Sequence, residues 1–322
     1  MWEENSGGEK VRPVIIAALS LFLLLSTAEA STIVVTVPDF KPIVEAVAGD
    51  GFEVYSLLPP GSDPHAFSLT VEDIEKMRKA DLIVLANSKL LDFEAKIASE
   101  FSNTLDFRDY NAKLYDFPGF ESNPHGYWML PENAVGIAKA VKDKLSEMYP
   151  GKKAQFEENF KVFVERVEEA EKEAKRISEG ESGRKYVAMV PGVCYIAKTY
   201  NLSVAAVLIS EGAGSASAGE LAEIRKKLES GDYRGIIVPE FMKGGKGEEM
   251  AKELVKGTNA KIAWVRFSSG DSAYDTMLIS NAARIAYAGG YAECSRDSVW
   301  IYVLSVLCVV EALIIAVIKV RL

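Results

Sequence analysis

The sequence predicts an α/β protein in which two lobes with mainly parallel sheets are joined by one long helix, followed by a C-terminal transmembrane helix. Three observations lead to this prediction. Short apolar runs typical of buried strands alternate with helical patterns between residues 31 and 292. One highly charged segment, residues 153–178, carries an apolar stripe of helical period. A long apolar run lies close to the C-terminus.

Composition limits the kind of partner that the protein can have. The chain has 322 residues, of which 48% are hydrophobic and 26% are charged, and its formal net charge is -9. This length suits two ordinary domains, and the composition is that of a globular protein. Because nucleic-acid binding depends on a basic surface that displaces counterions, the acidic balance argues against a nucleic-acid partner.

An apolar run over residues 13–27 follows Lys10 and Arg12 and ends in Ala28-Glu29-Ala30. It is short for a membrane span, and the small residues flanking Glu29 fit a cleavage site. Residues 1–30 are therefore predicted to be a secretory signal peptide, with an uncleaved anchor as the alternative.

A second apolar run, residues 299–318, precedes Lys319 and Arg321. A membrane span needs about 20 apolar residues, and basic flanks mark its cytoplasmic side. The expected localisation is therefore the cell membrane, with a single pass, an extracytoplasmic main body and a cytoplasmic C-terminus. Glu311 would lie within the hydrocarbon, where a carboxyl group usually faces a partner or becomes protonated.

The cysteines do not form a recognisable framework. Cys308 lies in the second apolar run, whereas Cys194 and Cys294 could pair outside the cell. Nothing in their spacing requires this pairing, so no disulfide framework is predicted.

The first lobe is predicted over residues 31–150. Strands are expected at residues 33–37, 52–58 and 82–86. Thr70 and Asp73 form a capping box that starts a helix, and Pro131 can start another.

One long amphipathic helix is predicted to link the lobes, over residues 151–180. Its apolar residues recur at alternating steps of four and three, and nearly all residues between them are Glu, Lys or Arg: Phe156, Phe160, Phe163, Val167, Ala170, Ala174 and Ile177. Such a helix is roughly 40 Å long at 1.5 Å per residue. The alternative is a coiled-coil dimer, but aromatic residues and alanines suit packing across a globular body better than a two-stranded seam.

The second lobe is predicted over residues 181–292, where strands and helices alternate again. Strands are expected at 186–190, 204–209, 235–238 and 261–267. Helices are expected at 195–200, 218–228, 248–255 and 274–287.

The chain has two histidines, His65 and His125, and their surroundings are alike. Each directly follows a proline that is itself preceded by an acid or an amide, and each lies in a loop of the first lobe. Ligands of open α/β sheets bind beyond the carboxyl ends of the strands, and proline stiffens the loops that hold the side chains. Neutral imidazole is the commonest ligand of zinc and related metals. The pattern therefore predicts one metal site shared by both histidines.

These motifs carry a resemblance to a known family. The segment Pro60-Gly61-Ser62-Asp63-Pro64-His65-Ala66-Phe67, followed by Thr70, Asp73 and residues 80–83, resembles the first signature of the zinc/manganese-specific solute-binding proteins of ABC importers. Further similar segments are residues 123–134, 156–163 and 270–277. The resemblance covers roughly residues 32–290. It implies two α/β lobes bridged by a rigid helix, a zinc or manganese ion held between them as the transported ligand, and an ABC transporter permease as partner.

The sequence departs from this family at two ligand positions. Val190-Pro191-Gly192 stands where the family has a His or Glu, and Ser268-Ser269 stands where it has an acid. Asp271 is close to the second position and could substitute for the acid. The other candidate donors are Glu211, Glu240, Asp39 and Cys194. A tetrahedral zinc site needs four donors, or three and a water. Acids of the second lobe or waters therefore complete the shell, or the ligand is not a bare ion.

The leading hypothesis is an extracytoplasmic solute-binding protein that captures a divalent transition metal for an ABC transporter permease. A membrane anchor would raise its effective concentration near that permease. The alternative is a degenerate family member that binds another small ligand or acts as a surface adhesion or sensing protein. A metal-dependent hydrolase is disfavoured because the sequence has no His-Glu-x-x-His run and no Gly-x-Ser-x-Gly elbow, so we expect no enzyme.

Overall fold

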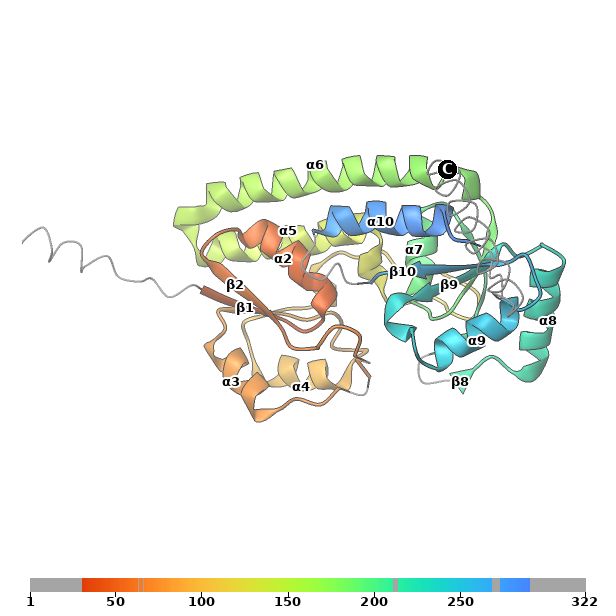
Figure 1. The fold of residues 1–322 in the computed structure, drawn as a ribbon. Coiled ribbons are helices and arrows are strands. Elements are labelled where there is room, and N and C mark those ends of the chain that lie inside the picture. The colour runs from red at the N-terminus through yellow and green to blue at the C-terminus, as the bar shows by residue number, and fades with distance from the viewer. Residues whose placement is uncertain (1–30, 63, 66, 211–213, 268–272, 290–322) are drawn as a thin grey trace, which may run out of the picture.

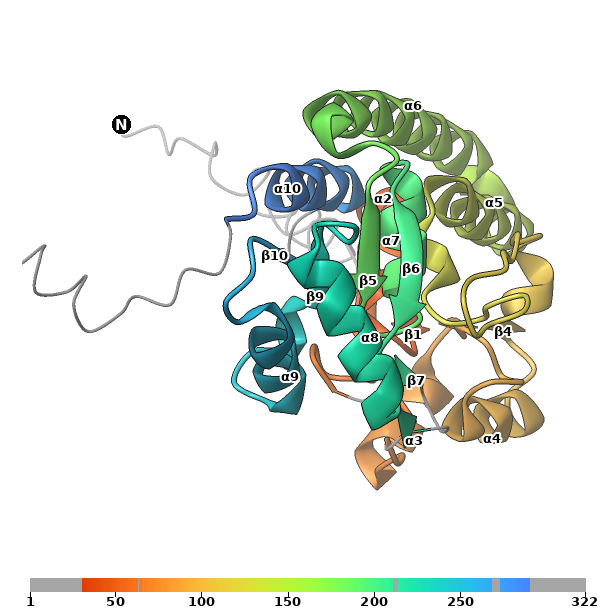
Figure 2. The ribbon, with the colours of Figure 1, turned by 90° about the vertical axis from the view of Figure 1, so that its right-hand side faces the viewer.

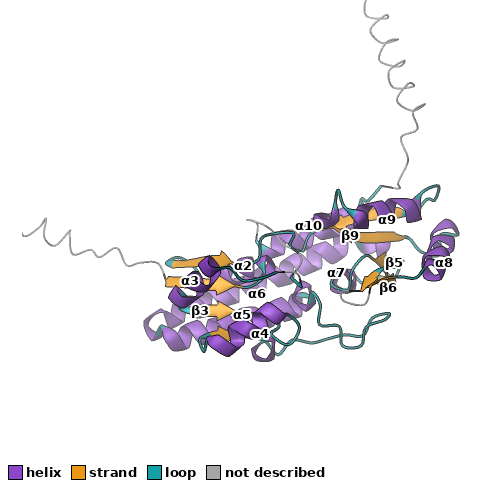
Figure 3. Cartoon of the chain, turned by 90° about the horizontal axis from the view of Figure 1, so that it is seen from below, coloured by secondary structure: helices purple, strands orange, loops and turns teal. Residues whose placement is uncertain are grey.

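Two α/β lobes lie side by side beneath one long helix in the computed structural model (Figure 1). The structure describes residues 31–289, except residues 63, 66, 211–213 and 268–272. Seen from below, the strands form two separate groups, one toward each end of the molecule (Figure 3). The predicted two-lobe α/β architecture with parallel sheets is therefore present.

The sheet of the first lobe has four parallel strands in the order β2-β1-β3-β4. These strands are β1 (Ser31–Val35), β2 (Phe52–Ser56), β3 (Leu82–Val84) and β4 (Thr104–Leu105). The helices are α2 (Lys41–Ala48), α3 (Val71–Lys79), α4 (Asp92–Glu100) and α5 (Pro131–Met148). Side chains of β1 alternate between two layers: Ile33 and Val35 join the core that includes α2 and α5, whereas Val34 packs with Met77 of α3 and Ile97 of α4.

The sheet of the second lobe is also four-stranded and parallel, in the order β10-β9-β5-β6. Its strands are β5 (Lys185–Ala188), β6 (Ser203–Val207), β9 (Gly235–Pro239) and β10 (Lys261–Val265). Its helices are α7 (Val193–Thr199), α8 (Ala218–Glu229), α9 (Lys246–Val255) and α10 (Tyr274–Ala286), with α10 lying beside α6 (Figure 2). A short antiparallel pair, β7 (Ile209–Ser210) and β8 (Gly214–Ser215), extends from this lobe.

Both sheets share one topology. Counted along the chain within each lobe, the spatial order of the strands is second, first, third, fourth. In such a sheet the chain switches sides between the first and third strands, and ligands bind in the crevice beyond the carboxyl ends of those strands. The expected sites are therefore the loops after β1 and β3 in one lobe and after β5 and β9 in the other.

The linking helix is α6 (Lys153–Ile177), and it packs against α5 of the first lobe and α10 of the second. Its buried residues are Phe156, Phe163, Val167, Ala170 and Ala174. This stripe joins the apolar residues of both lobes into one continuous core. The prediction of a helix packed across a globular body is confirmed.

Several 3-10 turns complete the described chain. They are η1 (Pro38–Phe40), η2 (Phe107–Asp109), η3 (Tyr127–Met129), η4 (Pro150–Lys152), η5 (Glu179–Glu181) and η6 (Glu240–Met242).

The expected helix starts are confirmed, whereas the expected strand ends differ. Thr70 and Asp73 form the predicted capping box, and Pro131 occupies the first turn of α5. Six of the predicted strands extend two residues beyond the observed strand ends, which are those of β1, β2, β3, β5, β6 and β10. Most of the extra residues are apolar and buried, and several still bond through their backbone nitrogens to the neighbouring strand: Leu57 to Val35, Leu85 to Leu105 and Met189 to Ile237. Helix α2 was not predicted, although Ile43, Val44 and Val47 have helical spacing and are buried.

The predicted transmembrane helix is not supported. Within the described part of the chain, no helix is both long and apolar enough to cross a membrane. The longest described helix, α6, is amphipathic, with charged residues over its outer face. Residues 299–318 lie outside the described residues, as do Glu311, Cys294 and the predicted signal peptide. The fold is therefore corrected to two lobes and a linking helix, and the lobe limits at 31–150 and 181–292 remain predictions.

Truncating the aromatic stripe of α6 should destabilise the whole molecule. Phe163 is 5% exposed, and its ring centroid lies 6.2 Å from that of Tyr274 in α10. Phe163→Ala should lower the free energy of unfolding by about 3–5 kcal/mol, because it leaves a cavity in the shared core. Val162→Ala, at a neighbouring position that is 42% exposed, should change it by less than about 0.5 kcal/mol. Urea denaturation of both variants measures this, and equal losses would contradict the packing role of α6.

Candidate metal centre

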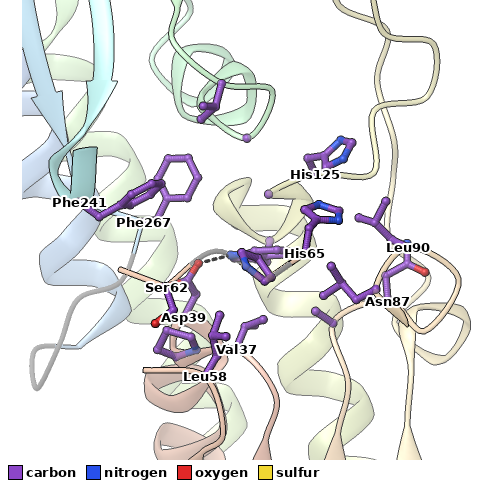
Figure 4. A pocket seen from close by; sticks show the side chains of 18 of the residues that line it. Val37, Asp39, Leu58, Ser62, His65, Asn87, Leu90, His125, Phe241 and Phe267 are labelled. Carbon is purple, nitrogen blue, oxygen red and sulfur yellow. Dashed lines mark hydrogen bonds between the residues drawn. The ribbon is translucent and has the colours of Figure 1, made fainter. Parts of the chain in front are cut away.

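A cavity of about 100 Å³ lies between the lobes, at the carboxyl ends of their strands. Loops after β1, β2 and β3 line it from the first lobe, and loops after β5, β9 and β10 line it from the second (Figure 4). Both topological switch points therefore face the same space. Val37, Leu58, Ala86 and Val190, which the sequence suggested as strand residues, lie in its wall.

The two histidines meet in this cavity. His65 comes from the loop after β2 and His125 from the loop before α5, and their ring centroids are 5.9 Å apart with a tilt of 49°. Zinc lies about 2.0–2.1 Å from an imidazole nitrogen, so rings at this separation can hold one ion between them. The structure thus brings together the residues expected to share a site, and their role as metal ligands remains a prediction.

Asn123 fixes the orientation of His125. Its side-chain oxygen lies 3.0 Å from both the backbone nitrogen and Nδ1 of His125. Its side-chain NH2 donates to the backbone oxygen of Pro191 at 2.9 Å, so its oxygen can only accept. Nδ1 of His125 is therefore the protonated nitrogen, and Nε2 carries the lone pair that a metal requires.

The same asparagine ties the histidine loop to the second lobe. Asn123 is fully buried, and its backbone oxygen accepts a hydrogen bond of 2.6 Å from the hydroxyl of Tyr195 in α7. Together with the bond to Pro191, this makes two direct links between the loop before α5 and the second lobe. The position of His125 therefore depends on how the lobes sit together.

Two glycines allow the backbones of the lobes to touch beside His125. Gly126 has φ +66°, and a Cβ on it would lie 2.7 Å from Cα of Gly192. A Cβ on Gly192 would lie 2.8 Å from the ring of Phe267. Val190-Pro191-Gly192, at the position where the resemblance implied a third ligand, therefore contributes backbone contact and no side-chain donor.

Asp39 lines the cavity but already has a partner. Its Oδ2 accepts a hydrogen bond of 2.8 Å from the indole nitrogen of Trp128. Burial raises the pKa of Asp39 to about 6, and the hydrogen bond from Trp128 opposes part of that rise. Among the residues that the structure describes, no three or more His, Cys, Asp or Glu side chains come close enough to hold a metal together.

The other proposed donors divide into two groups. Cys194 is a buried free thiol, and burial raises its pKa to about 12, so it stays protonated near neutral pH. Glu240 pairs with Lys243 and Arg266 at 2.7 and 2.8 Å; although burial opposes ionisation, these bonds lower its pKa to about 2. Asp271 and Glu211, together with Ser268-Ser269, lie outside the described residues.

Glu94 joins the strand ends that border the cavity, and the sequence analysis did not single it out. Its carboxyl group accepts hydrogen bonds from the hydroxyl of Thr36, after β1, and from the backbone nitrogens of Ala86 and Asn87, after β3. The two backbone bonds are 2.8 and 2.6 Å long. Burial raises the pKa of Glu94 to about 7 against these hydrogen bonds, which lower it. The only signal in the local sequence was that Glu94 follows the buried Phe93 and lies on a helix face whose other residues are apolar.

The family is decided by comparison of the whole sequence. The family described as zinc-uptake complex component A, periplasmic, matches residues 33–288. The chain belongs to this family. The resemblance inferred from the two histidine motifs is thereby confirmed.

Curated relatives are named as substrate-binding lipoproteins of metal ABC transporters. The chain is 27% identical over 219 residues to the iron ABC transporter protein MtsA of Streptococcus pyogenes serotype M6, covering 61% of this chain and 70% of that protein. It is 25% identical over 281 residues to the manganese ABC transporter protein ScaA of Streptococcus gordonii, covering 78% and 87%.

Solved structures share the fold. The crystal structure of ZnuA matches with a TM-score of 0.68 and 21% identity, over 80% of this chain and 99% of that one. The Mn2+ complex of the substrate-binding protein FpvC from Pseudomonas aeruginosa matches with a TM-score of 0.66 and 18% identity, over 80% and 97%. At these identities the likeness concerns the fold.

The predicted single-pass localisation is corrected in the same way as the fold. No described helix is long and apolar enough to span a membrane, and the relatives named above are called lipoproteins. Membrane attachment through a C-terminal helix is therefore not supported as a feature of this chain.

Glu94 should make the stability of the protein depend on pH. The pKa of its carboxyl is raised from 4.5 to about 7 in the folded protein. As the pH rises through that window, the unfolded chain loses this proton before the folded protein does, so the free energy of unfolding falls. Glu94→Gln should lower stability by about 1–3 kcal/mol, because a backbone donor then faces an amide NH2, and it should remove this contribution to the slope.

Urea denaturation at about pH 5 and about pH 7 measures that slope. Glu100→Gln, an exposed position at the end of the same helix, is the matched control and should keep the wild-type dependence. If the free energy of unfolding changed with pH in the same way for wild type and Glu94→Gln, the pH dependence could not be assigned to Glu94.

Proposed function

We propose that this chain is an extracytoplasmic solute-binding protein that captures a divalent transition metal, zinc or manganese, between its lobes for delivery to an ABC transporter permease. The observation that carries the proposal is the pair His65 and His125, with ring centroids 5.9 Å apart in the interlobe cavity of a member of this family. The proposed role is binding and not catalysis.

The arrangement suits capture of a soft or borderline cation. Two imidazoles supply nitrogen donors, which suit zinc, whereas manganese would call for oxygen donors beside them. Asn123 presets the tautomer of His125 before any metal arrives, which lowers the cost of ordering the site. The formal charge of -9 also favours the approach of cations over anions.

Two protein nitrogens leave a tetrahedral shell half complete, since zinc takes four donors. In the proposed site, Asp271 and Glu211 of the second lobe stay candidates for the remaining positions, as do water or donors brought in with the metal. The linking helix α6 packs on both lobes, so release to a permease would involve a small displacement of the lobes and not a wide hinge motion.

Removing either histidine should abolish tight metal binding. Loss of an outer partner of a ligand typically costs 10- to 100-fold in metal affinity, so His65→Ala and His125→Ala should each cost at least about 100-fold. Calorimetric titration with zinc and with manganese measures the change. Ser62→Ala, which also lines the cavity, is the control and should keep wild-type affinity. Unchanged affinity in both histidine variants would remove the metal-capture proposal.

Asn123 should act on the metal only through His125. Asn123→Ala should weaken zinc binding by about 10- to 100-fold, because the imidazole loses the acceptor that sets its tautomer. Asn159→Ala is a matched control, since Asn159 also donates an amide hydrogen bond to a backbone oxygen, that of Val47, but lies away from the cavity. If the two variants bound zinc equally well, Asn123 would have no positioning role.

A further inference from the structure

The second-lobe wall of the cavity is apolar in the part of the chain that the structure describes. Its lining residues there are Val190, Gly192, Phe241 and Phe267. The two phenyl rings are nearly perpendicular, at 83°, with centroids 5.7 Å apart. Figure 4 shows them across the cavity from His65 and His125. A wall of this kind offers contact area and no lone pair to a metal.

Phe241 also reaches the loop that carries His65. A Cβ built on Gly61 would lie 3.4 Å from Cβ of Phe241, so the two loops approach each other closely. Phe241 is nevertheless 50% exposed, which is unusual for an aromatic residue between two packed lobes. The exposed area of this ring is therefore available to a molecule inside the cavity or at its mouth.

The cavity is larger than a directly coordinated ion needs. A single water requires about 10–15 Å³ of such space, and the cavity has about 100 Å³. Waters completing the metal shell would need two to four polar partners each; the first lobe offers Asp39, Ser62 and Asn87, whereas the phenyl and valine surfaces of the second lobe supply none. An organic ligand brings its own donors and gains by burying its apolar part against the same surfaces.

We propose that the cargo of this site is a metal chelate, a divalent ion carried with a small chelator that coordinates through one nitrogen and one oxygen and packs an apolar ring against Phe241 and Phe267. The inference rests on the proposed function and specifies its substrate. His65 and His125 would supply two nitrogen donors and the chelator the other two, which completes a four-coordinate shell. The aromatic wall would select chelates with a flat apolar body, since aromatic rings pair edge to face or offset.

A matched pair of chelators tests this proposal. Picolinate and glycinate offer the same nitrogen and oxygen donors and the same charge, and only picolinate has an aromatic ring. We expect zinc with picolinate to bind the full chain about tenfold more tightly than zinc with glycinate or zinc alone, the gain of one good aromatic contact. Equilibrium dialysis with labelled picolinate should show one picolinate retained for each zinc.

Variants of the wall separate ring contact from coordination. Phe241→Leu and Phe267→Leu should each reduce the advantage of picolinate to about threefold or less, because a leucine cannot make the ring–ring contact. Phe160→Leu, a partly buried phenylalanine on α6 away from the cavity, is the control and should keep the full advantage. Melting temperatures of the variants confirm that each one is folded.

The outcomes distinguish this inference from the proposed function. Zinc alone could bind as tightly as either chelate, with the chelators only competing with the protein for zinc. If His65→Ala still abolishes zinc binding in that case, the chelate proposal is overturned and metal capture stands. If the two chelates bind equally well, and neither Phe241→Leu nor Phe267→Leu changes their affinities, the proposed contact between the chelator ring and the aromatic wall is overturned. Failure to bind zinc in any form overturns the proposed function together with this inference.

Discussion

The hydrogen bonds of one buried amide hold the candidate site and the two lobes in a single arrangement. Asn123 accepts from the backbone and ring nitrogens of His125, donates to the backbone of Pro191 and accepts from Tyr195. Asn123 is fully buried. Leaving any of these groups without a hydrogen-bond partner would therefore destabilise the protein far more than one exposed hydrogen bond stabilises it. The orientation of a histidine in the first lobe is thus set by atoms of the second lobe.

The cavity itself follows from topology. Both sheets have the same strand order, and their carboxyl ends face each other, so the two switch points open into one space. The two halves then differ in chemistry. The first lobe contributes both imidazoles and the buried Asp39, whereas the described wall of the second lobe is made by Val190, Gly192 and two phenyl rings. A common fold therefore determines where the site is, and a few loop residues determine what it can hold.

Local physics was enough to predict much of this molecule. The capping box at Thr70, the proline start of α5 and the apolar stripe of α6 depend on neighbouring residues, and each was found. The histidine pair was predictable because similar short motifs carry both rings. The partners of Asn123 and Glu94 were not, since they lie 68 and 58 positions away in Pro191 and Thr36. The strand ends were overrun because the residues that directly follow the strands are mostly buried and apolar as well. Hydropathy alone led to the unsupported membrane helix.

In the proposed role, the same network would couple opening of the lobes to release of the cargo. Both histidines belong to the first lobe, so the lobes can part without either imidazole being carried away from the other. Parting them would, however, break the bonds from Asn123 to Pro191 and Tyr195 and would separate Gly126 from Gly192. Asn123 would then lose the second-lobe partners that fix its own position, and through it the imidazole of His125 would be held less firmly as a donor to the metal. In this role the closed arrangement would strengthen coordination through hydrogen bonds between the lobes, in addition to any ligand that the second lobe supplies, and a small movement would be enough to weaken it.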